Sequence, residues 1–225
     1  ATAVAAAKMM KLDTEKVRMA LGIAASLTGG LKRNFGTMTK SLHAGMAAHD
    51  GIIAASLAKQ GFSADYSIFE VPQGYCQIYS QNYNLEKITQ GLGSPFDIIS
   101  PGLTIKPYPC CRATHLSIDA MLYLIHKHDI KAGDVVEVKC RTAPSVPVML
   151  YYHEPKASLE GKFSLEYCMA VALLDRDVKL AQFEDERVSR SDVQKLLRKV
   201  RYVHPEGTDW TGEARPATAV TVRLK

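Results

Sequence analysis

K-P-Y-P-C-C-R-A-T-H-L-S-I-D-A-M-L-Y-L-I-H-K-H, residues 106–128, is the stretch from which the fold of this chain can be predicted. The run T-I-K before its two prolines is predicted to be the end of a strand. The prolines fix the backbone φ angle and withhold N–H donors, so the strand must stop there. Beyond Arg112 the apolar side chains recur at helical spacing, at Leu116, Ala120, Tyr123 and Leu124. The stretch therefore predicts a strand, a rigid turn and a helix of about residues 111–128.

The turn in this stretch gathers basic and sulfur-containing side chains close to the start of a helix. Lys106, Arg112 and His115 lie within ten residues of one another, with Cys110 and Cys111 between them. The first N–H groups of a helix are unpaired and carry partial positive charge, which stabilises a carboxylate or phosphate. The pattern predicts an anion site. The alternative is a structural turn whose lysine and arginine are merely solvated.

The composition is that of an ordinary globular protein. The chain has 225 residues, 47% hydrophobic and 23% charged, with a net charge of +5, and this length holds one large or two small domains. The charge allows an anionic substrate but lacks the clustering of nucleic-acid-binding proteins. The sequence has no apolar run of membrane length. We expect neither nucleic acid nor membrane as a partner, and a cytoplasmic location, or a mitochondrial one in a eukaryote.

The cysteines also bear on cofactors and compartment. There are five of them, Cys76, Cys110, Cys111, Cys140 and Cys168. No C-x-x-C spacing occurs, and two adjacent cysteines make a poor zinc pair. Free thiols in a reducing compartment are the simplest interpretation. We expect no metal and no other cofactor.

The first hundred residues predict helices packed through small side chains. Asp13 is a good N-cap for a helix to about Leu27. Thr39 or Ser41 can cap a further helix, expected over about residues 42–60. Its small residues suggest tight packing of a buried helical layer; they are Ala44, Ala47, Ala48, Ala54 and Ala55. Asn84 can cap a short helix to about residue 90.

Residues after about 104 predict a mixture of helices and strands. Apolar and charged residues alternate over 136–141, which is typical of a half-buried strand. Ser164 caps a helix of residues 165–175, and S-D-V-Q at Ser191 fits a capping box that opens a helix to about residue 200. Residues 200–204 and 218–224 are predicted to be strands. Such alternation predicts a small sheet with helices on one face.

These expectations define two domains within an incomplete protein. Glycine and proline interrupt the chain between about residues 91 and 104, which predicts a domain boundary. The expected fold class is α plus α+β, with residues 1–100 as part of a large all-helical domain and residues 104–225 as a smaller α+β domain. The sequence opens inside an alanine-rich helix and closes on an alternating strand, so we expect a piece of a longer protein, cut at both ends.

Cations and proton-transferring groups define the candidate site. No P-loop, dinucleotide fingerprint, HExxH or GxSxG motif occurs in the sequence. The cations that could hold carboxylates are Lys40, Lys106, Arg112 and Lys162, and the groups that could move protons are His43, His115 and Tyr167. For each, the alternative is a structural ion pair, hydrogen bond or packing contact. Cys111 and His115, four residues apart on one helix face, could instead form a thiol nucleophile pair.

Three stretches, in order along the chain, resemble segments of the MmgE/PrpD family, the 2-methylcitrate dehydratase-like proteins. They are N-F-G-T-M-T-K-S-L-H-A-G at 34–45, K-P-Y-P-C-C-R-A-T-H at 106–115 and K-F-S-L-E-Y-C at 162–168. The resemblance implies a large helical domain with a smaller α+β lid, an active site in the cleft between them, and a homodimer. It also implies action on small di- or tricarboxylates without an iron–sulfur cluster, as dehydratase, decarboxylase or epimerase.

The same resemblance assigns roles to single residues. The lysine and histidine of the family's T-K-P-L-H motif fall on Lys40 and His43, the lysine of its Pro-turn motif on Lys106, a second histidine of that motif on His115, and its tyrosine after F-S-x-x on Tyr167. Cys111 stands where decarboxylases of the family carry a histidine implicated in catalysis, which argues against decarboxylation. The chain covers about half of the family's length, and further histidine and aspartate residues of the family have no counterpart in it.

The interpretation that uses most of these residues is a metal-independent lyase. One group takes the proton α to a carboxylate, another protonates the departing hydroxyl, and the lysines stabilise the charge that develops. The expected reaction is dehydration of a small tricarboxylate such as 2-methylcitrate, with Arg112, Lys162 and Cys111 binding the substrate. The alternatives are decarboxylation or epimerisation of a related acid, and a non-catalytic fragment for dimerisation or metabolite binding.

Overall fold

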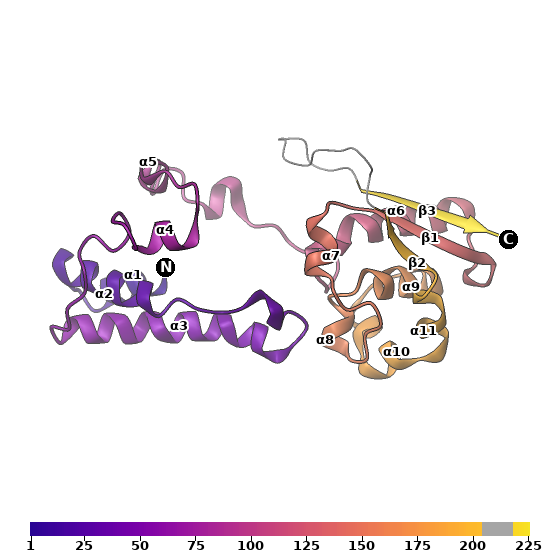
Figure 1. The fold of residues 1–225 in the computed structure, drawn as a ribbon, viewed down its shortest axis with the longest axis horizontal. Coiled ribbons are helices and arrows are strands. Elements are labelled where there is room, and N and C mark those ends of the chain that lie inside the picture. Colours follow the sequence, from indigo (N-terminus) through magenta and orange to yellow (C-terminus); the bar gives the residue numbers. More distant parts are fainter. Residues whose placement is uncertain (204–217) are drawn as a thin grey trace. The chain divides into compact units, whose positions relative to one another are not determined.

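The computed structural model describes residues 1–203 and 218–225. It contains helices throughout and one small sheet of three strands (Figure 1). The predicted fold class, α plus α+β, is therefore confirmed. None of the helices in the described part of the chain is long and apolar enough to cross a membrane.

The chain forms two compact units. The N-terminal unit consists of Ala1–Arg33 and Thr39–Thr104, and the C-terminal unit of Asn34–Met38 and Ile105–Lys225. The short excursion at residues 34–38 is tied to the C-terminal unit by Phe35, whose carbonyl accepts hydrogen bonds from two tyrosine hydroxyls and whose ring packs on Phe163 at 5.3 Å. Sequence patterns gave no sign of this excursion.

The N-terminal unit is built on helices α1 (Thr2–Met9), α2 (Thr14–Ser26) and α3 (Met38–Lys59). The Asp13 carboxylate accepts a hydrogen bond from the Lys16 N–H at 2.9 Å and so begins α2, as predicted. The core cluster of this unit is mostly alanine, with one methionine and one isoleucine: Ala3, Ala7, Met19, Ala20, Ile23, Ala54, Ala55 and Ala58. Their size lets the helix backbones come close together.

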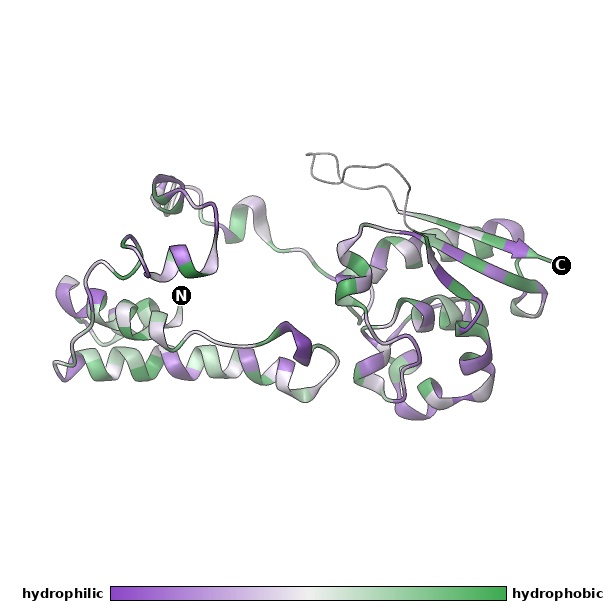
Figure 2. Ribbon diagram, in the orientation of Figure 1, coloured by the Kyte–Doolittle hydropathy of each residue, from purple (hydrophilic) through white to green (hydrophobic). Residues whose placement is uncertain are grey.

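Helix α3 differs from its prediction at its start and in its packing. It begins at Met38, so Thr39 and Ser41 lie inside its first turns rather than before them. Its buried residues all lie in the second half, from Gly51 to Ala58. Ala44, Ala47 and Ala48 are exposed, so the expected tight packing there is wrong for the described residues. Figure 2 shows hydrophobic and hydrophilic residues mixed along α3, and the side chains of its first half are mostly exposed.

Short helices follow in the N-terminal unit. They are α4 (Tyr75–Tyr79), α5 (Leu85–Thr89) and a π-helical turn, η2 (Ile98–Gly102). Asn84 accepts from the Lys87 N–H at 3.1 Å and caps α5, as predicted. The strand expected just before the prolines is wrong, because residues 103–106 have no strand structure and Ile105 is 89% exposed. An isolated extended segment has no ladder partner to make it a strand.

The C-terminal unit contains a three-stranded sheet in the order β2-β1-β3. The central strand β1 (Val135–Arg141) runs parallel to β2 (Val200–Val203) and antiparallel to β3 (Ala219–Leu224). In register, Val138 pairs with Val200 on one side and with Val222 on the other. The three predicted strands are confirmed, except that His204, the last residue expected in the second, lies outside the described residues.

Helices form the larger core with this sheet. They are α6 (His115–His128), α9 (Leu165–Asp175) and α11 (Ser191–Leu197), with the short α7 (Ser145–Met149), α8 (Ser158–Gly161) and α10 (Asp185–Ser189) between them. Helices α6 and α9 contact the strands of the sheet, and α11 packs on α9. Every residue of α9 from Leu165 to Leu173 is buried. A helix that is buried on every side and mostly apolar belongs inside a core. Burial of each large side chain contributes roughly 1.5–3 kcal/mol to stability.

Two predicted helix starts in this unit had different outcomes. The Ser164 hydroxyl accepts from the Tyr167 N–H at 3.1 Å and caps α9, as predicted. The capping box expected at Ser191 is wrong, since Arg190 is the N-cap and Ser191 is already helical. Asp192 instead pairs with the Arg190 guanidinium at 2.7 Å. Helix α11 ends at Leu197 because residue 200 begins β2.

Candidate active site

The turn of residues 106–111, called the Pro turn below, closes around the backbone carbonyl of Cys110. The Lys106 ammonium donates to this oxygen at 3.2 Å, and the His115 Nε2 lies 3.4 Å from the same oxygen. A carbonyl only accepts, so this contact assigns the ring proton to Nε2 and leaves Nδ1 as an acceptor. One carbonyl thus holds two of the predicted catalytic side chains next to each other.

Lys162 joins the Pro turn from the segment that precedes α9. The Cys111 N–H donates to the Lys162 carbonyl oxygen at 2.9 Å and ties the two segments together. The positive charges of Lys106 and Lys162 both act on the Cys110 thiol and lower its pKa, after a larger effect from the hydrogen bond with Cys168. Two ammonium groups from distant parts of the sequence therefore lie near one turn.

His115 is the imidazole of this cluster and was predicted to move protons. Its side chain is at the start of α6, and the residue is only 7% exposed. Burial lowers the pKa of the imidazole below its ordinary value; the Cys110 carbonyl opposes this, and the charges of Lys106 and Arg112 add to it. The ring is therefore neutral at neutral pH and has a free acceptor nitrogen, as a general base requires.

Tyr108 and Asp119 support His115, and the sequence did not single out this pair. The Tyr108 ring meets the His115 ring edge to face, with centroids 5.4 Å apart. Its hydroxyl donates to the Asp119 carboxylate at 2.6 Å, and burial together with this hydrogen bond raises the pKa of the tyrosine. Asp119 is four residues after His115, so helical spacing could have placed the carboxylate on the same face.

Arg112 adds a further cation at the entrance to α6. It opens the 3₁₀ turn of residues 112–114, and its side chain is exposed. Within the described residues, no hydrogen bond or ion pair holds its guanidinium. An exposed guanidinium beside a buried imidazole can accept a carboxylate in bidentate fashion.

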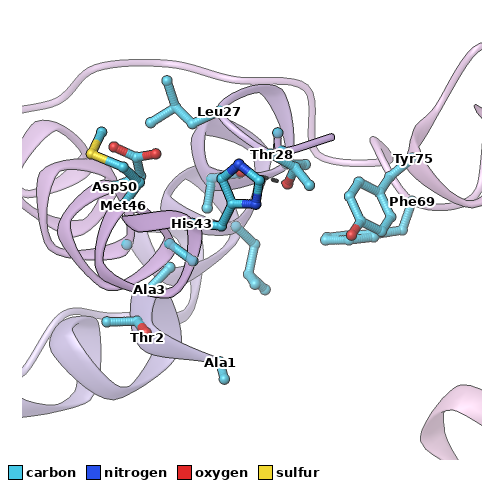
Figure 3. A pocket seen from close by; sticks show the side chains of 17 residues that line it. Ala1, Thr2, Ala3, Leu27, Thr28, His43, Met46, Asp50, Phe69 and Tyr75 are labelled. Atoms are coloured by element: carbon cyan, nitrogen blue, oxygen red, sulfur yellow. Dashed lines mark hydrogen bonds between the residues drawn. The ribbon is translucent and has the colours of Figure 1, made fainter. Parts of the chain in front are cut away.

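Lys40 and His43 lie in the first turns of α3, in the N-terminal unit. Lys40 is exposed, and no acidic residue is present in the first turn of its helix. His43 lines a cavity of about 550 Å³ together with Asp50 and Tyr75, and Figure 3 shows its ring in the middle of the lining side chains. A Cβ atom at Gly30, where φ is +117°, would lie 3.1 Å from His43 Nδ1, so glycine there leaves room for the ring.

Two family models match the chain along most of its length. The model described as the MmgE/PrpD N-terminal domain matches residues 1–88, and the one described as the MmgE/PrpD C-terminal domain matches residues 108–225. The chain belongs to the MmgE/PrpD family. The resemblance seen in three short stretches is confirmed by these matches.

Similar proteins within the MmgE/PrpD family include several cis-aconitate decarboxylases. The mouse protein is 30% identical over 212 residues, which cover 91% of this chain and 42% of the relative. The Aspergillus terreus protein is 29% identical over 242 residues, covering 100% of this chain and 49% of the relative. The human protein is 28% identical over 210 residues. The chain spans a little under half the length of these curated relatives.

Tyr167, a predicted site residue in the C-terminal unit of this MmgE/PrpD chain, has its side chain in the core. Its side chain is fully buried, packs on Phe183 at 5.7 Å between ring centroids, and donates its hydroxyl hydrogen to the Gln182 carbonyl. Burial raises the pKa of the hydroxyl. A catalytic role for Tyr167 stays a prediction, and the arrangement described above does not use it.

The other predicted residues fall into two groups. Those gathered at the Pro turn are Lys106, Cys111, Arg112, His115 and Lys162. Lys40 and His43 lie within one turn of each other on α3. Across residues 1–203 and 218–225, no group of three or more His, Cys, Asp or Glu side chains is arranged to hold a metal ion. A reaction without metal or other cofactor stays a prediction.

Proposed function

We propose that this MmgE/PrpD protein is a lyase that acts on a small tricarboxylate by acid–base catalysis at the Pro turn. The observation that carries the proposal is the shared carbonyl of Cys110, which holds the Lys106 ammonium and the neutral His115 imidazole together. A cation and a base held side by side suit a reaction in which negative charge develops next to a carboxylate.

Substrate binding is assigned to the cations of the turn. Lys106, Arg112 and Lys162 offer positive charge for the carboxylates of the substrate, and Arg112 is exposed and unpaired within the described residues. Each charge-assisted hydrogen bond of this kind contributes roughly 1.5–3 kcal/mol. Cys111, partly exposed in the same turn, is the third predicted substrate-binding residue beside Arg112 and Lys162.

The proton step is assigned to His115. Its Nδ1 takes the proton from the carbon α to a carboxylate, and Lys106 stabilises the enediolate-like charge that develops on that carboxylate. Tyr108 and Asp119 keep the imidazole in place during the transfer. We further propose that Lys40 and His43 act on the same substrate, with His43 as the candidate acid for the leaving group.

Two reactions fit this machinery, and different observations favour them. Dehydration, as of 2-methylcitrate, needs a neutral base first, which the lowered pKa of His115 supplies. Decarboxylation is favoured by the similar proteins, which are named cis-aconitate decarboxylases. Cys111 occupies the position at which decarboxylases of the family are expected to carry a histidine, so dehydration is our first choice. The homodimer and the cytoplasmic or mitochondrial location stay predictions.

Product analysis tests the proposal directly. Purified protein is incubated with 2-methylcitrate and, separately, with cis-aconitate, and the products are identified by chromatography and by released carbon dioxide. We expect an unsaturated tricarboxylate from 2-methylcitrate. Carbon dioxide from cis-aconitate would make decarboxylation the reaction. Tight binding of both acids without any product would support the non-catalytic alternative and remove the lyase proposal.

A further inference from the structure

Cysteine side chains from two segments meet beneath the Pro turn. Cys110 is in the turn, and Cys168 is in the first turn of α9. The Cys111 N–H···O=C bond to Lys162 and the 3.9 Å contact of Cys168 Sγ with the Gly161 carbonyl place the turn against the start of that helix. The two thiols lie close enough for each to shift the pKa of the other. Both cysteines are free thiols.

We propose that Cys110 is a site of reversible oxidation by peroxides, and that Cys168 is the thiol that resolves it into a disulfide. The proposal assigns a modification to two thiol side chains that the acid–base mechanism leaves unused. Formation of the disulfide does not depend on the proposed function. Only its expected effect on catalysis rests on that function.

The surroundings of Cys110 favour a reactive thiolate. A thiolate is the nucleophilic form, and nearby cations stabilise it. The hydrogen bond with Cys168 lowers the pKa of the Cys110 thiol most, and Thr114, at 3.0 Å from Sγ, and the two lysines of the turn lower it further against the opposing effect of burial. Burial raises the pKa of Cys168 well above its usual range, so Cys168 keeps its proton.

Burial also decides which of the two cysteines the peroxide oxidises first. Cys168 is completely enclosed, whereas Cys110 is 4% exposed and adjoins the partly exposed Cys111. A peroxide, which is little larger than water, therefore reaches Cys110 first. Cys168 then attacks from the buried side of the turn.

The chemistry balances with a peroxide as the oxidant. The Cys110 thiolate attacks one peroxide oxygen, the O–O bond breaks and hydroxide leaves, which gives a sulfenic acid; the hydroxide takes up the proton that the thiol released on ionising and becomes the first water. The Cys168 sulfur attacks the Cys110 sulfur, the S–O bond breaks and a second water leaves, with the Cys168 proton taken up by the departing oxygen. Two thiols are oxidised by two electrons, and a dithiol reverses the change.

The disulfide changes the site because Cys110 carries the carbonyl that holds Lys106 and His115. A covalent bond from its side chain to α9 displaces the residue and weakens both contacts. We therefore expect oxidised protein to lose most of its lyase activity. Cys140 is a matched control, because burial raises the pKa of its thiol to about 12 and it lies in the sheet.

Peptide mapping of peroxide-treated protein tests the proposal. The protein is treated with hydrogen peroxide, its remaining thiols are alkylated, and it is digested with trypsin. Cleavage after Lys87, Arg112, Lys162 and Arg176 yields peptides 88–112 and 163–176, which hold Cys110 with Cys111 and Cys168 respectively. We expect these peptides to be linked after oxidation and separate after dithiothreitol. The Cys111→Ser variant keeps the link and so assigns it to Cys110.

Variants separate the resolving thiol from a structural role. Cys168→Ala and Cys168→Ser, checked for folding by circular dichroism, should give no linked peptide and should lose activity to peroxide irreversibly. Cys140→Ala should behave as the wild type. A link between Cys110 and Cys111, no link in the wild type, or dithiol-reversible inactivation of a folded Cys168 variant would each overturn the proposal. If the wild type forms the link but has no lyase activity, the proposed function fails and the oxidation site stands.

Discussion

The two units of this chain hold their candidate site residues in different ways. In the C-terminal unit, α9 is buried from Leu165 to Leu173. The Pro turn is hydrogen-bonded to the segment that precedes α9, through the Cys111 N–H and the Lys162 carbonyl. In the N-terminal unit, the first half of α3, which carries Lys40 and His43, is exposed, and the core is made mostly of alanine. Lys106 and His115 are thus fixed by a core and a shared carbonyl. A site held in this way is preorganised, and its chemistry can be argued from contacts alone.

Truncation of a core methionine should show the largest difference between the units. Met169→Ala on α9 removes a fully buried side chain and is expected to lower the free energy of unfolding by about 2–5 kcal/mol. Met46→Ala on α3, where the side chain is 43% exposed, should change it by no more than about 0.5 kcal/mol. Urea denaturation followed by circular dichroism measures both. Equal losses would mean that α3 is better packed than described.

Removal of the helix caps should repeat this contrast on a smaller scale. Ser164→Ala takes away a buried cap at the start of α9 and should cost about 1–2 kcal/mol. Asn84→Ala affects the exposed five-residue helix α5 and should cost about 0.5 kcal/mol, at the low end for caps. Hydrogen exchange of the amides of each helix reports the local effect. A larger loss at Asn84 would reverse the ranking of the two units.

Tyr108→Phe tests the support of His115. The variant loses the 2.6 Å hydrogen bond to Asp119 but keeps the ring against the imidazole. The expected loss in stability is about 0.5–1 kcal/mol, because one partner of the bond is exposed. Thermal unfolding measures this loss, and Tyr123→Phe, on the exposed side of α6, is the control. If the two variants lose the same stability, the hydrogen bond from the Tyr108 hydroxyl makes no specific contribution to the support of His115.

The pH dependence of stability should reveal the buried imidazole. The pKa of His115 is lower in the folded protein than in the unfolded chain, so the unfolded state binds more protons in this range. The free energy of unfolding should therefore fall as pH drops below the ordinary histidine pKa of about 6.5. His115→Gln should lessen that fall, and His128→Gln controls for the loss of one exposed histidine. Parallel curves for His115→Gln and the wild type would contradict the assignment.

The sequence-based predictions were most accurate for features that depend only on residues close together in the chain. Asp13, Asn84 and Ser164 were recognised as caps, because a cap needs only a side chain and the next turn of helix. The strand at residues 103–106 was not correct, because strand structure depends on a partner that the sequence pattern cannot supply. The burial of α3 failed for the same reason, since small residues allow close packing without showing what packs there.

The candidate site follows the same division. Lys106, Arg112 and His115 were predicted together because they are close in sequence. Lys162 was predicted only as a cation that could hold a carboxylate; its approach to the turn involves a hydrogen bond from Cys111 that sequence spacing does not show. Tyr167 was proposed for proton transfer, yet its hydroxyl is engaged in the core by Gln182. Tyr108 was missed because its role arises from ring contact across the turn.

The most direct test of the central claim is the kinetic effect of Lys106, whose ammonium shares the Cys110 carbonyl with His115. Lys106→Ala is compared with Lys127→Ala, an exposed lysine at the far end of α6. For turnover of the tricarboxylate, the account predicts at least about a tenfold loss of kcat/KM, roughly 1.4 kcal/mol, in the first variant and none in the second. An unchanged kcat/KM in folded Lys106→Ala would contradict it.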